Sequence, residues 1–261
     1  RNKQRERGRK KRTKQYKGRF KFKKIMVPPK TTISQTTINH KNLKTVKKNI
    51  LKYSPHPKKV KIIAVTKTLS FSAIRSATEH KIFNIGENRA QETKQKFANQ
   101  KKHKHTQIHL IGHLQSNKAA MAVKIYNVIQ SVDNIKILNK INKCAQTNNK
   151  PQKIFLQLNI SGAETQTGFN KNEIMKAAIL AQQMAFINNI GIMSIGAHTK
   201  NQTTIKRNFT KTKQIQKKIY QTIDLNCKQL SMGMSQDYIL ALRAGATQIR
   251  LGTILFKKQS G

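Results

Sequence analysis

The sequence predicts an α/β fold: a single (β/α)8 barrel of the TIM type, with one extra helix before its first strand. Short apolar runs rich in β-branched residues recur eight times from about Val60 onward, and segments with helical spacing separate them. No Gly- or Pro-rich linker interrupts residues 26–261, so they are expected to form one domain. An open, doubly wound sheet is the alternative, and the strand count decides between the two because two of the eight runs are weak.

The eight runs are the expected strands. They are short and largely apolar, which is typical of strands buried on both faces of a parallel sheet. In chain order they are residues 60–65, 82–85, 108–111, 125–129, 154–160, 190–195, 229–232 and 247–251.

Amphipathic segments between these runs are the expected helices. In the segment 134–145, Ile137, Leu138 and Ile141 share one face behind Asp133, which is the predicted N-cap. Similar spacing predicts further helices, and one of them precedes the first strand. The further segments are 36–52, 172–186 and 209–223.

The amino-terminal segment differs from the rest of the chain. Residues 1–24 hold 14 Lys and Arg against one acid, Glu6, and show neither apolar periodicity nor a helix cap. Residues 1–25 are therefore expected to be a disordered basic tail, which would bind nucleic acid only non-specifically. Because the first methionine is Met26, the alternative is that this segment does not belong to the natural protein.

The composition excludes several classes of protein. The formal net charge is +44, from 53 Lys and Arg against 9 Asp and Glu, yet aromatic residues make up only 6% and Trp is absent. A nucleic-acid reader concentrates bases on one face and interleaves aromatics, so compositional drift explains the charge better. No membrane span or signal peptide is visible. Cys144 and Cys227 are too few and too far apart for a disulfide framework or a zinc site, which favours the cytoplasm.

Chemistry in a (β/α)8 barrel lies where strands end and βα loops begin. The last two strands are followed by Gly233-Met234-Ser235 and by Gly252-Thr253, whose small residues and hydroxyls are typical of an anion nest. A phosphate-bearing ligand is therefore the first hypothesis, with Lys67 across the barrel mouth as an amine able to form a Schiff base. The alternatives are a solvated lysine, an ordinary turn with a serine cap and, for Arg250, an ion-pair residue at the barrel end.

The same strand ends carry longer motifs. These motifs closely resemble those of the pyridoxal phosphate homeostasis protein family (YggS/PROSC type), and the resemblance covers about residues 36–256. They are Ala64-Val65-Thr66-Lys67, Gly86-Glu87-Asn88, His109-Leu110-Ile111-Gly112, Leu114-Gln115-Ser116-Asn117-Lys118, Gln157-Leu158-Asn159, Ser231-Met232-Gly233-Met234-Ser235 and Arg250-Leu251-Gly252-Thr253.

The resemblance implies the alanine-racemase-type barrel and pyridoxal 5′-phosphate as cofactor. It implies that Lys67 holds the cofactor as a Schiff base, that Asn88 lies near the ring, and that Arg250 faces the pyridine nitrogen. It further implies that Ser235, Gly252 and Thr253 hold the phosphate, with Met234 packed at its edge. Met193 and Ser194, at the end of the sixth strand, complete the predicted cofactor-binding set.

Five positions depart from the family's pattern. Gln166 stands where the family has a lysine, Leu69 replaces a second basic residue after the first strand, and Lys257 replaces a glycine. Arg89 and His113 replace a frequent Tyr and Pro. None of these changes removes a predicted phosphate or Schiff-base contact, but the lost basic positions leave secondary binding or release roles open.

The first functional hypothesis is a monomeric, non-enzymatic protein that holds pyridoxal 5′-phosphate and passes it to apo-enzymes. The alternative is a racemase-like enzyme that uses the same cofactor. A racemase of this fold draws a second base from a following β-domain, for which the sequence after the eighth strand leaves no room. A nucleic-acid-binding protein is the third hypothesis and rests on charge alone. No metal site is expected.

Overall fold

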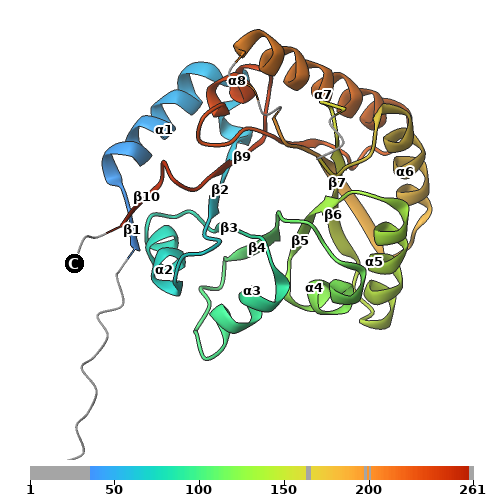
Figure 1. The fold of residues 1–261 in the computed structure, drawn as a ribbon, viewed down its shortest axis with the longest axis horizontal. Coiled ribbons are helices and arrows are strands. Elements are labelled where there is room, and N and C mark those ends of the chain that lie inside the picture. Colours follow the sequence, from blue (N-terminus) through green and yellow to red (C-terminus); the bar gives the residue numbers. More distant parts are fainter. Residues whose placement is uncertain (1–35, 163–165, 197–198, 200, 259–261) are drawn as a thin grey trace, which may run out of the picture. The chain divides into compact units, whose positions relative to one another are not determined.

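The computed structural model describes residues 36–162, 166–196, 199 and 201–258. The predicted basic tail, residues 1–25, lies outside the described residues. Eight parallel strands close into a barrel, since β2 pairs with both β3 and β9 (Figure 1). The closed barrel confirms the predicted fold and excludes the open sheet. Its strands are β2 Lys61–Val65, β3 Asn84–Glu87, β4 Gln107–Leu110, β5 Val128–Val132, β6 Gln152–Leu158, β7 Ile187–Ser194, β8 Gln229–Ser231 and β9 Gln248–Leu251.

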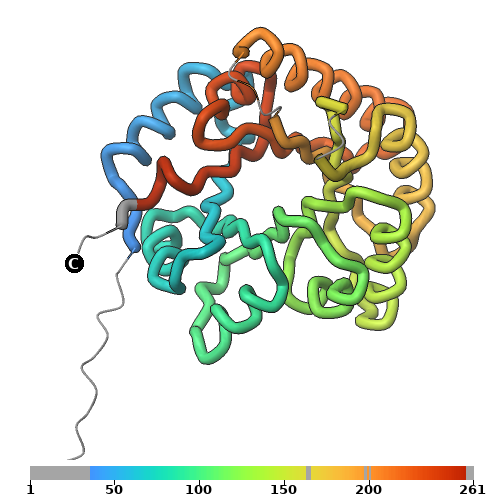
Figure 2. The backbone as a smooth tube through the Cα atoms, viewed as in Figure 1, coloured from blue at the N-terminus to red at the C-terminus, as the bar shows by residue number. Residues whose placement is uncertain are grey.

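Helices surround the barrel on the outside, as the smooth tube in Figure 2 shows. Their apolar faces pack on the strands, and residues such as Leu138 and Ile141 are fully buried there. None of the helices in the described ranges is both long and apolar enough to cross a membrane. The helices are α1 His40–Tyr53, α2 Phe71–Glu79, α3 Ala90–Phe97, α4 Ala119–Ile125, α5 Ile135–Thr147, α6 Lys171–Gln183, α7 Gln202–Thr222 and α8 Tyr238–Arg243, with short 3-10 helices at Pro57–Lys59 and Ser116–Lys118.

The first predicted helix was placed too early. Thr36–Ile38 forms a short strand, β1, which pairs antiparallel with β10, Phe256–Lys258. Helix α1 begins only at His40 because the Asn39 side chain caps it, accepting a hydrogen bond from the Asn42 N–H at 3.2 Å. The two ends of the described chain are thereby joined beside the barrel (Figure 1).

The predicted strand at 125–129 was also misplaced. Helix α4 continues through Ile125, and β5 starts three residues later at Val128. Between them Asn127 accepts a hydrogen bond from the Ile108 N–H at 2.8 Å, which ends the helix beside the start of β4. An apolar run cannot by itself distinguish the last turn of a buried helix from a strand, and here that ambiguity produced the error.

Three helix ends differ from their predicted positions. Asn134, not Asp133, caps α5 by accepting from the Ile137 N–H at 2.9 Å. Helix α6 begins at a capping box between Asn170 and Glu173 and ends three residues earlier than expected. Helix α7 begins at Gln202, seven residues before the predicted start, because Ile205 is the only apolar residue among residues 202–208 and makes no visible period by itself.

Candidate functional site

The predicted site residues follow five different strands, and the structure brings the ends of those strands together at one end of the barrel (Figure 1). Lys67 follows β2 and is exposed. Gly252 follows β9, and a Cβ added to it would lie 3.5 Å from the Val65 carbonyl oxygen. The loop after β9 therefore lies against the strand end that carries Lys67, as expected for neighbours across the closure of the barrel.

A buried ion pair fixes the end of β2. Glu87 is 1% exposed, and its Oε1 accepts from the Thr66 hydroxyl and from the Lys96 ammonium, each at 2.6 Å. Lys96 also donates to the Thr66 carbonyl oxygen at 2.8 Å. The residue immediately before Lys67 is thus held through both its side chain and its backbone. Lys96 was not among the predicted site residues, because nothing in its local sequence indicates which strand it reaches.

Asn88 follows β3 and is half-buried. The loop after β4 lies directly on it, since a Cβ added to Gly112 would approach the Asn88 carbonyl oxygen to 2.5 Å. A side chain at Gly112 would therefore displace Asn88 from the barrel mouth. The strand ends of β2, β3 and β4 form one continuous packed rim.

The loops after β8 and β9 offer free hydrogen-bond donors. The backbone N–H groups of Ser235, Gly252 and Thr253 make no hydrogen bond to any described residue. The Arg250 N–H donates to the Gly233 carbonyl oxygen at 3.0 Å, which ties the loop after β8 to strand β9. Groups of this kind form an anion-binding concavity, and the residues present therefore fit a phosphate.

Gly233 shapes this cradle. Its φ is +89°, and a Cβ added to it would lie 2.5 Å from the Cβ of Ala241. Next to it the Met234 N–H donates to the Asp237 carboxylate at 2.6 Å, while Met234 itself is 39% exposed. Burial raises the pKa of Asp237, and the Met234 N–H and the nearby Arg250 partly offset this rise. Asp237 therefore stabilises the turn rather than competing with an anion for the three free donors.

Arg250 is 5% exposed and lies inside the barrel. Its Nη1 donates to the Ser231 hydroxyl and its Nη2 to the Ser194 carbonyl oxygen, both at 2.8 Å. Burial lowers its pKa to about 10, with partial compensation from Asp237. The guanidinium therefore remains charged at neutral pH, as a fixed cation below the mouth.

Met193 and Ser194 are consecutive residues at the end of β7, so their side chains point to opposite faces of the barrel wall. The Met193 side chain is buried with Val128 and Phe155, and its contact with the cofactor stays a prediction. The Ser194 hydroxyl is fully buried and makes no hydrogen bond to a described residue. An orphaned buried hydroxyl is uncommon in folded proteins, and a bound water would explain it.

Comparison with known proteins places this site in a family. A sequence profile of the alanine racemase N-terminal domain matches residues 41–260. The pyridoxal phosphate homeostasis protein of Synechocystis is 34% identical over 200 residues, covering 77% of this chain and 92% of that protein. The chain belongs to the pyridoxal phosphate homeostasis protein family. The family's protein from Buchnera aphidicola is also 34% identical, over 84% of this chain and 96% of its own length.

Solved structures agree with this assignment. The structure of PipY from Synechococcus elongatus with pyridoxal phosphate bound is 29% identical, with a TM-score of 0.74. The match covers 83% of this chain and 99% of PipY. An alanine racemase from Clostridium difficile has a TM-score of 0.65 at 17% identity, covering 86% of this chain and 57% of the racemase. That likeness shows the barrel fold alone.

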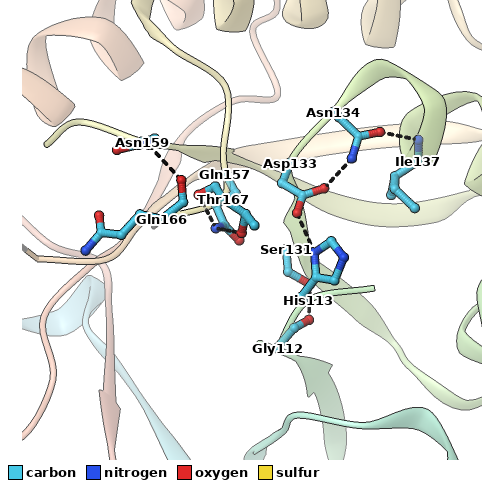
Figure 3. Close-up of polar contacts among 10 residues, drawn as sticks. All are labelled: Gly112, His113, Ser131, Asp133, Asn134, Ile137, Gln157, Asn159, Gln166 and Thr167. Carbon is cyan, nitrogen blue, oxygen red and sulfur yellow. Dashed lines mark hydrogen bonds and ion pairs between the residues drawn. The ribbon is translucent and has the colours of Figure 1, made fainter. Parts of the chain in front are cut away.

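In this member of the pyridoxal phosphate homeostasis protein family, Gln166 takes part in a network of amides (Figure 3). Its carbonyl oxygen accepts from the Asn159 amide at 2.8 Å, and its own amide nitrogen donates to the Gly196 carbonyl oxygen at 3.3 Å. Nearby, the Gln157 amide donates to the Thr167 carbonyl oxygen at 2.7 Å. Gln166 thus connects the loops after β6 and β7 without a charge.

His113 contacts Asp133 at the rim of the barrel (Figure 3). Its Nδ1 lies 2.7 Å from the Asp133 Oδ2, and the other carboxylate oxygen accepts from the Asn134 amide at 2.8 Å. The Ser131 hydroxyl donates to the Gly112 carbonyl oxygen at 2.6 Å beside this pair. Asp133 therefore joins the loops after β4 and β5 instead of capping α5 as predicted.

Proposed function

We propose that this protein binds pyridoxal 5′-phosphate at the carboxyl ends of its barrel strands and keeps it available to the cell without turning over a substrate. The observation that carries the proposal is the set of three free N–H groups of Ser235, Gly252 and Thr253, in loops of which the one after β9 lies beside the strand end that carries Lys67. The bound pyridoxal phosphate of PipY and the names of the curated relatives support it.

The predicted residues take different roles in this proposal. Ser235, Gly252 and Thr253 would hold the phosphate, with Met234 at its edge. When bound, the cofactor supplies an aldehyde and a pyridine ring, and the Lys67 amine would form a Schiff base with the aldehyde and release water. Asn88 would lie beside the ring, and Ser194 would act through its backbone carbonyl oxygen, which accepts from Arg250.

Arg250 makes storage of the cofactor more plausible than catalysis. A cation facing the pyridine nitrogen disfavours its protonation, which weakens the electron sink that catalysis by this cofactor requires. Because Arg250 is buried and held by two hydrogen bonds, it cannot swing away easily. The proposed role is therefore holding and handing over the cofactor, as a monomer in the cytoplasm, with apo-enzymes as recipients.

The first experiment adds pyridoxal phosphate to the purified protein and reduces the complex with borohydride. Visible absorbance should appear, and mass spectrometry should locate the added group on Lys67. The variant Lys67→Ala should lose the covalent adduct yet keep weak binding through the phosphate cradle. Lys61→Ala is the matched control, because Lys61 is an exposed lysine at the opposite end of the same strand. A protein that stays colourless and unmodified would overturn the proposal.

The second experiment tests the racemase alternative. Single L-amino acids are incubated with the loaded protein, and the D-enantiomers are measured over time. The proposal expects no sustained turnover above the rate of free pyridoxal phosphate. Sustained production that disappears in Lys67→Ala would establish an enzyme instead.

A further inference from the structure

A connected set of polar side chains crosses the barrel interior below Arg250. Its members come from β3, β4, β5, β8 and β9 and belong to residues far apart in the sequence. All but Asn84, which is half-buried, are at most 5% exposed. The set contains Arg250, Ser231, Gln130, Gln248, His109 and Asn84.

The direction of each hydrogen bond follows from Arg250. A guanidinium can only donate, so the Ser231 oxygen accepts from it at 2.8 Å. The Ser231 hydroxyl hydrogen is then free to be donated to the Gln130 Oε1, which lies 2.6 Å away. The structure thus places the Gln130 oxygen toward Ser231 and its nitrogen toward Gln248 and His109.

The Gln130 nitrogen in turn determines the state of His109. Its two hydrogens are donated to the Gln248 Oε1 at 2.7 Å and to the His109 Nδ1 at 2.9 Å. His109 Nδ1 must therefore carry a lone pair, and the ring's hydrogen lies on Nε2, which donates to the Asn84 oxygen at 3.2 Å. Burial supports this neutral form, since it lowers the pKa of His109 to about 3.

No member of the set can be turned without cost. Reversing the Gln130 amide would place its oxygen against both the Gln248 Oε1 and the His109 Nδ1 lone pair, so Gln248 and His109 would have to change with it. Buried polar groups that lose their partners are strongly unfavourable, and in a connected network the cost spreads to the neighbours. The position of the Arg250 guanidinium therefore depends on side chains from β4 and β5, which do not contact it directly.

We propose that Gln130, backed by neutral His109, is a positioning residue that holds the Arg250 guanidinium in one orientation toward the cofactor ring. This inference rests on the proposed function, in which Arg250 faces the pyridine nitrogen. Gln130 touches neither the cofactor nor a reacting atom, and it acts through Ser231. Its effect is to keep the ring nitrogen unprotonated.

The chain provides a matched control for this inference. Gln152 on β6 is also a buried glutamine, 4% exposed, and its amide nitrogen donates to the Tyr126 and Asn127 carbonyl oxygens. None of its hydrogen bonds leads to Arg250. Replacing Gln152 by Leu therefore removes a buried amide of the same size without disturbing the Arg250 set.

The first arm of the test uses the cofactor-free protein. NMR of 15N-labelled histidine should show His109 as the neutral form with its hydrogen on Nε2 across the neutral pH range. A hydrogen on Nδ1, or a charged ring, would overturn the proposed order of hydrogen bonds. This arm does not depend on cofactor binding, so its failure is distinguishable from failure of the proposed function.

The second arm uses the loaded protein and 15N-labelled pyridoxal phosphate. The ring nitrogen should be unprotonated in the natural protein and in Gln152→Leu, and partly protonated in Gln130→Leu. The dissociation constant for pyridoxal phosphate should rise about tenfold in Gln130→Leu. A factor of this size corresponds to the weakening of one hydrogen bond to a charged group, here the Arg250 guanidinium. Ser231→Ala, a smaller change, should shift the nitrogen signal in the same direction if Gln130→Leu does not fold. If the ring nitrogen gives the same signal in Gln152→Leu as in Gln130→Leu and Ser231→Ala, so far as these two fold, the inference is overturned.

Discussion

Two ion pairs lie near each other at the barrel mouth, and they differ in almost every physical respect. Glu87 and Lys96 are 1% and 12% exposed and share a 2.6 Å contact, while Arg89 and Glu92 are 76% and 45% exposed at 2.9 Å. The buried pair also binds the Thr66 backbone. The contrast shows that a charge in this protein matters according to its burial and its partners, whatever the total charge of +44 suggests.

The largest effect is expected from breaking the buried pair. Glu87→Ala leaves the Lys96 ammonium and the Thr66 hydroxyl without their acceptor inside the protein. Loss of one partner of a buried pair costs about 4 kcal/mol of unfolding free energy. Urea unfolding of the two proteins measures it, and a cost below about 1 kcal/mol would contradict the distinction drawn between the pairs.

The second effect concerns the uncharged interior and its dependence on pH. The pKa of His109 is lowered from 6.5 to about 3 in the folded protein, so between these values the unfolded chain binds more protons. The contribution of neutral His109 to the free energy of unfolding is therefore fully present above pH 6.5 and is lost as the pH falls toward 3. The loss between pH 6.5 and about pH 4 should reach about 3 kcal/mol. His109→Gln should flatten this part of the urea-unfolding profile; an unchanged slope would show that other groups cause it.

The third effect compares an interior glycine with an exterior one. Both Gly233 and Gly162 have positive φ, at +89° and +72°, but only the first has neighbours where a Cβ would stand. Gly162→Ala should cost about 1 kcal/mol, from backbone conformation alone. Gly233→Ala should cost about 2 kcal/mol or more because of the added contact with Ala241, and it should weaken phosphate binding. Thermal unfolding with and without added phosphate would measure the stability costs and the change in phosphate binding. Equal stability costs in the two variants would indicate that the loop around Gly233 adjusts easily to an added Cβ.

The smallest effect is expected at the exposed pair. Glu92→Ala should lower stability by about 0.5 kcal/mol, because solvent and salt already screen the charges of Arg89 and Glu92. The difference should shrink further at high salt, whereas that of Glu87→Ala should persist. Equal salt dependence in the two variants, measured by urea unfolding, would remove the physical basis of the comparison.

Much of the fold was readable from the sequence because it rests on local patterns. The alternation of apolar runs and amphipathic segments predicted the closed barrel, and the structure confirms it. The errors occur where a local pattern is ambiguous. Ile125 is apolar in either a helix or a strand, and Asp133 and Asn134 are both good caps. Strand β1 escaped notice because its partner, Phe256–Lys258, is more than 200 residues away.

The residues of the candidate site likewise fall into those that local sequence patterns could predict and those that they could not. Lys67, the turn at Gly233 and the residues after β9 could be predicted because strand ends and small residues are visible in the sequence; their contacts with a cofactor stay a prediction. Lys96, and the hydrogen bonds that connect Arg250 to His109, could not be found. They depend on which side chains meet inside the closed barrel, and residue type and spacing do not encode such long-range contacts.

The short ribbon of β1 and β10 has a consequence for the order in which the protein comes apart. Strand β2 and strand β9 are the first and last of the barrel, and their pairing closes the longest loop within the barrel itself. Closing such a loop is slow, because its entropy is lost before the contacts form. The ribbon, tied to α2 through the Ile38 N–H and the Ser76 hydroxyl at 3.0 Å, lies beside this seam. Opening of the barrel should therefore begin with release of the ribbon, and its amides should exchange with solvent before those of the seam.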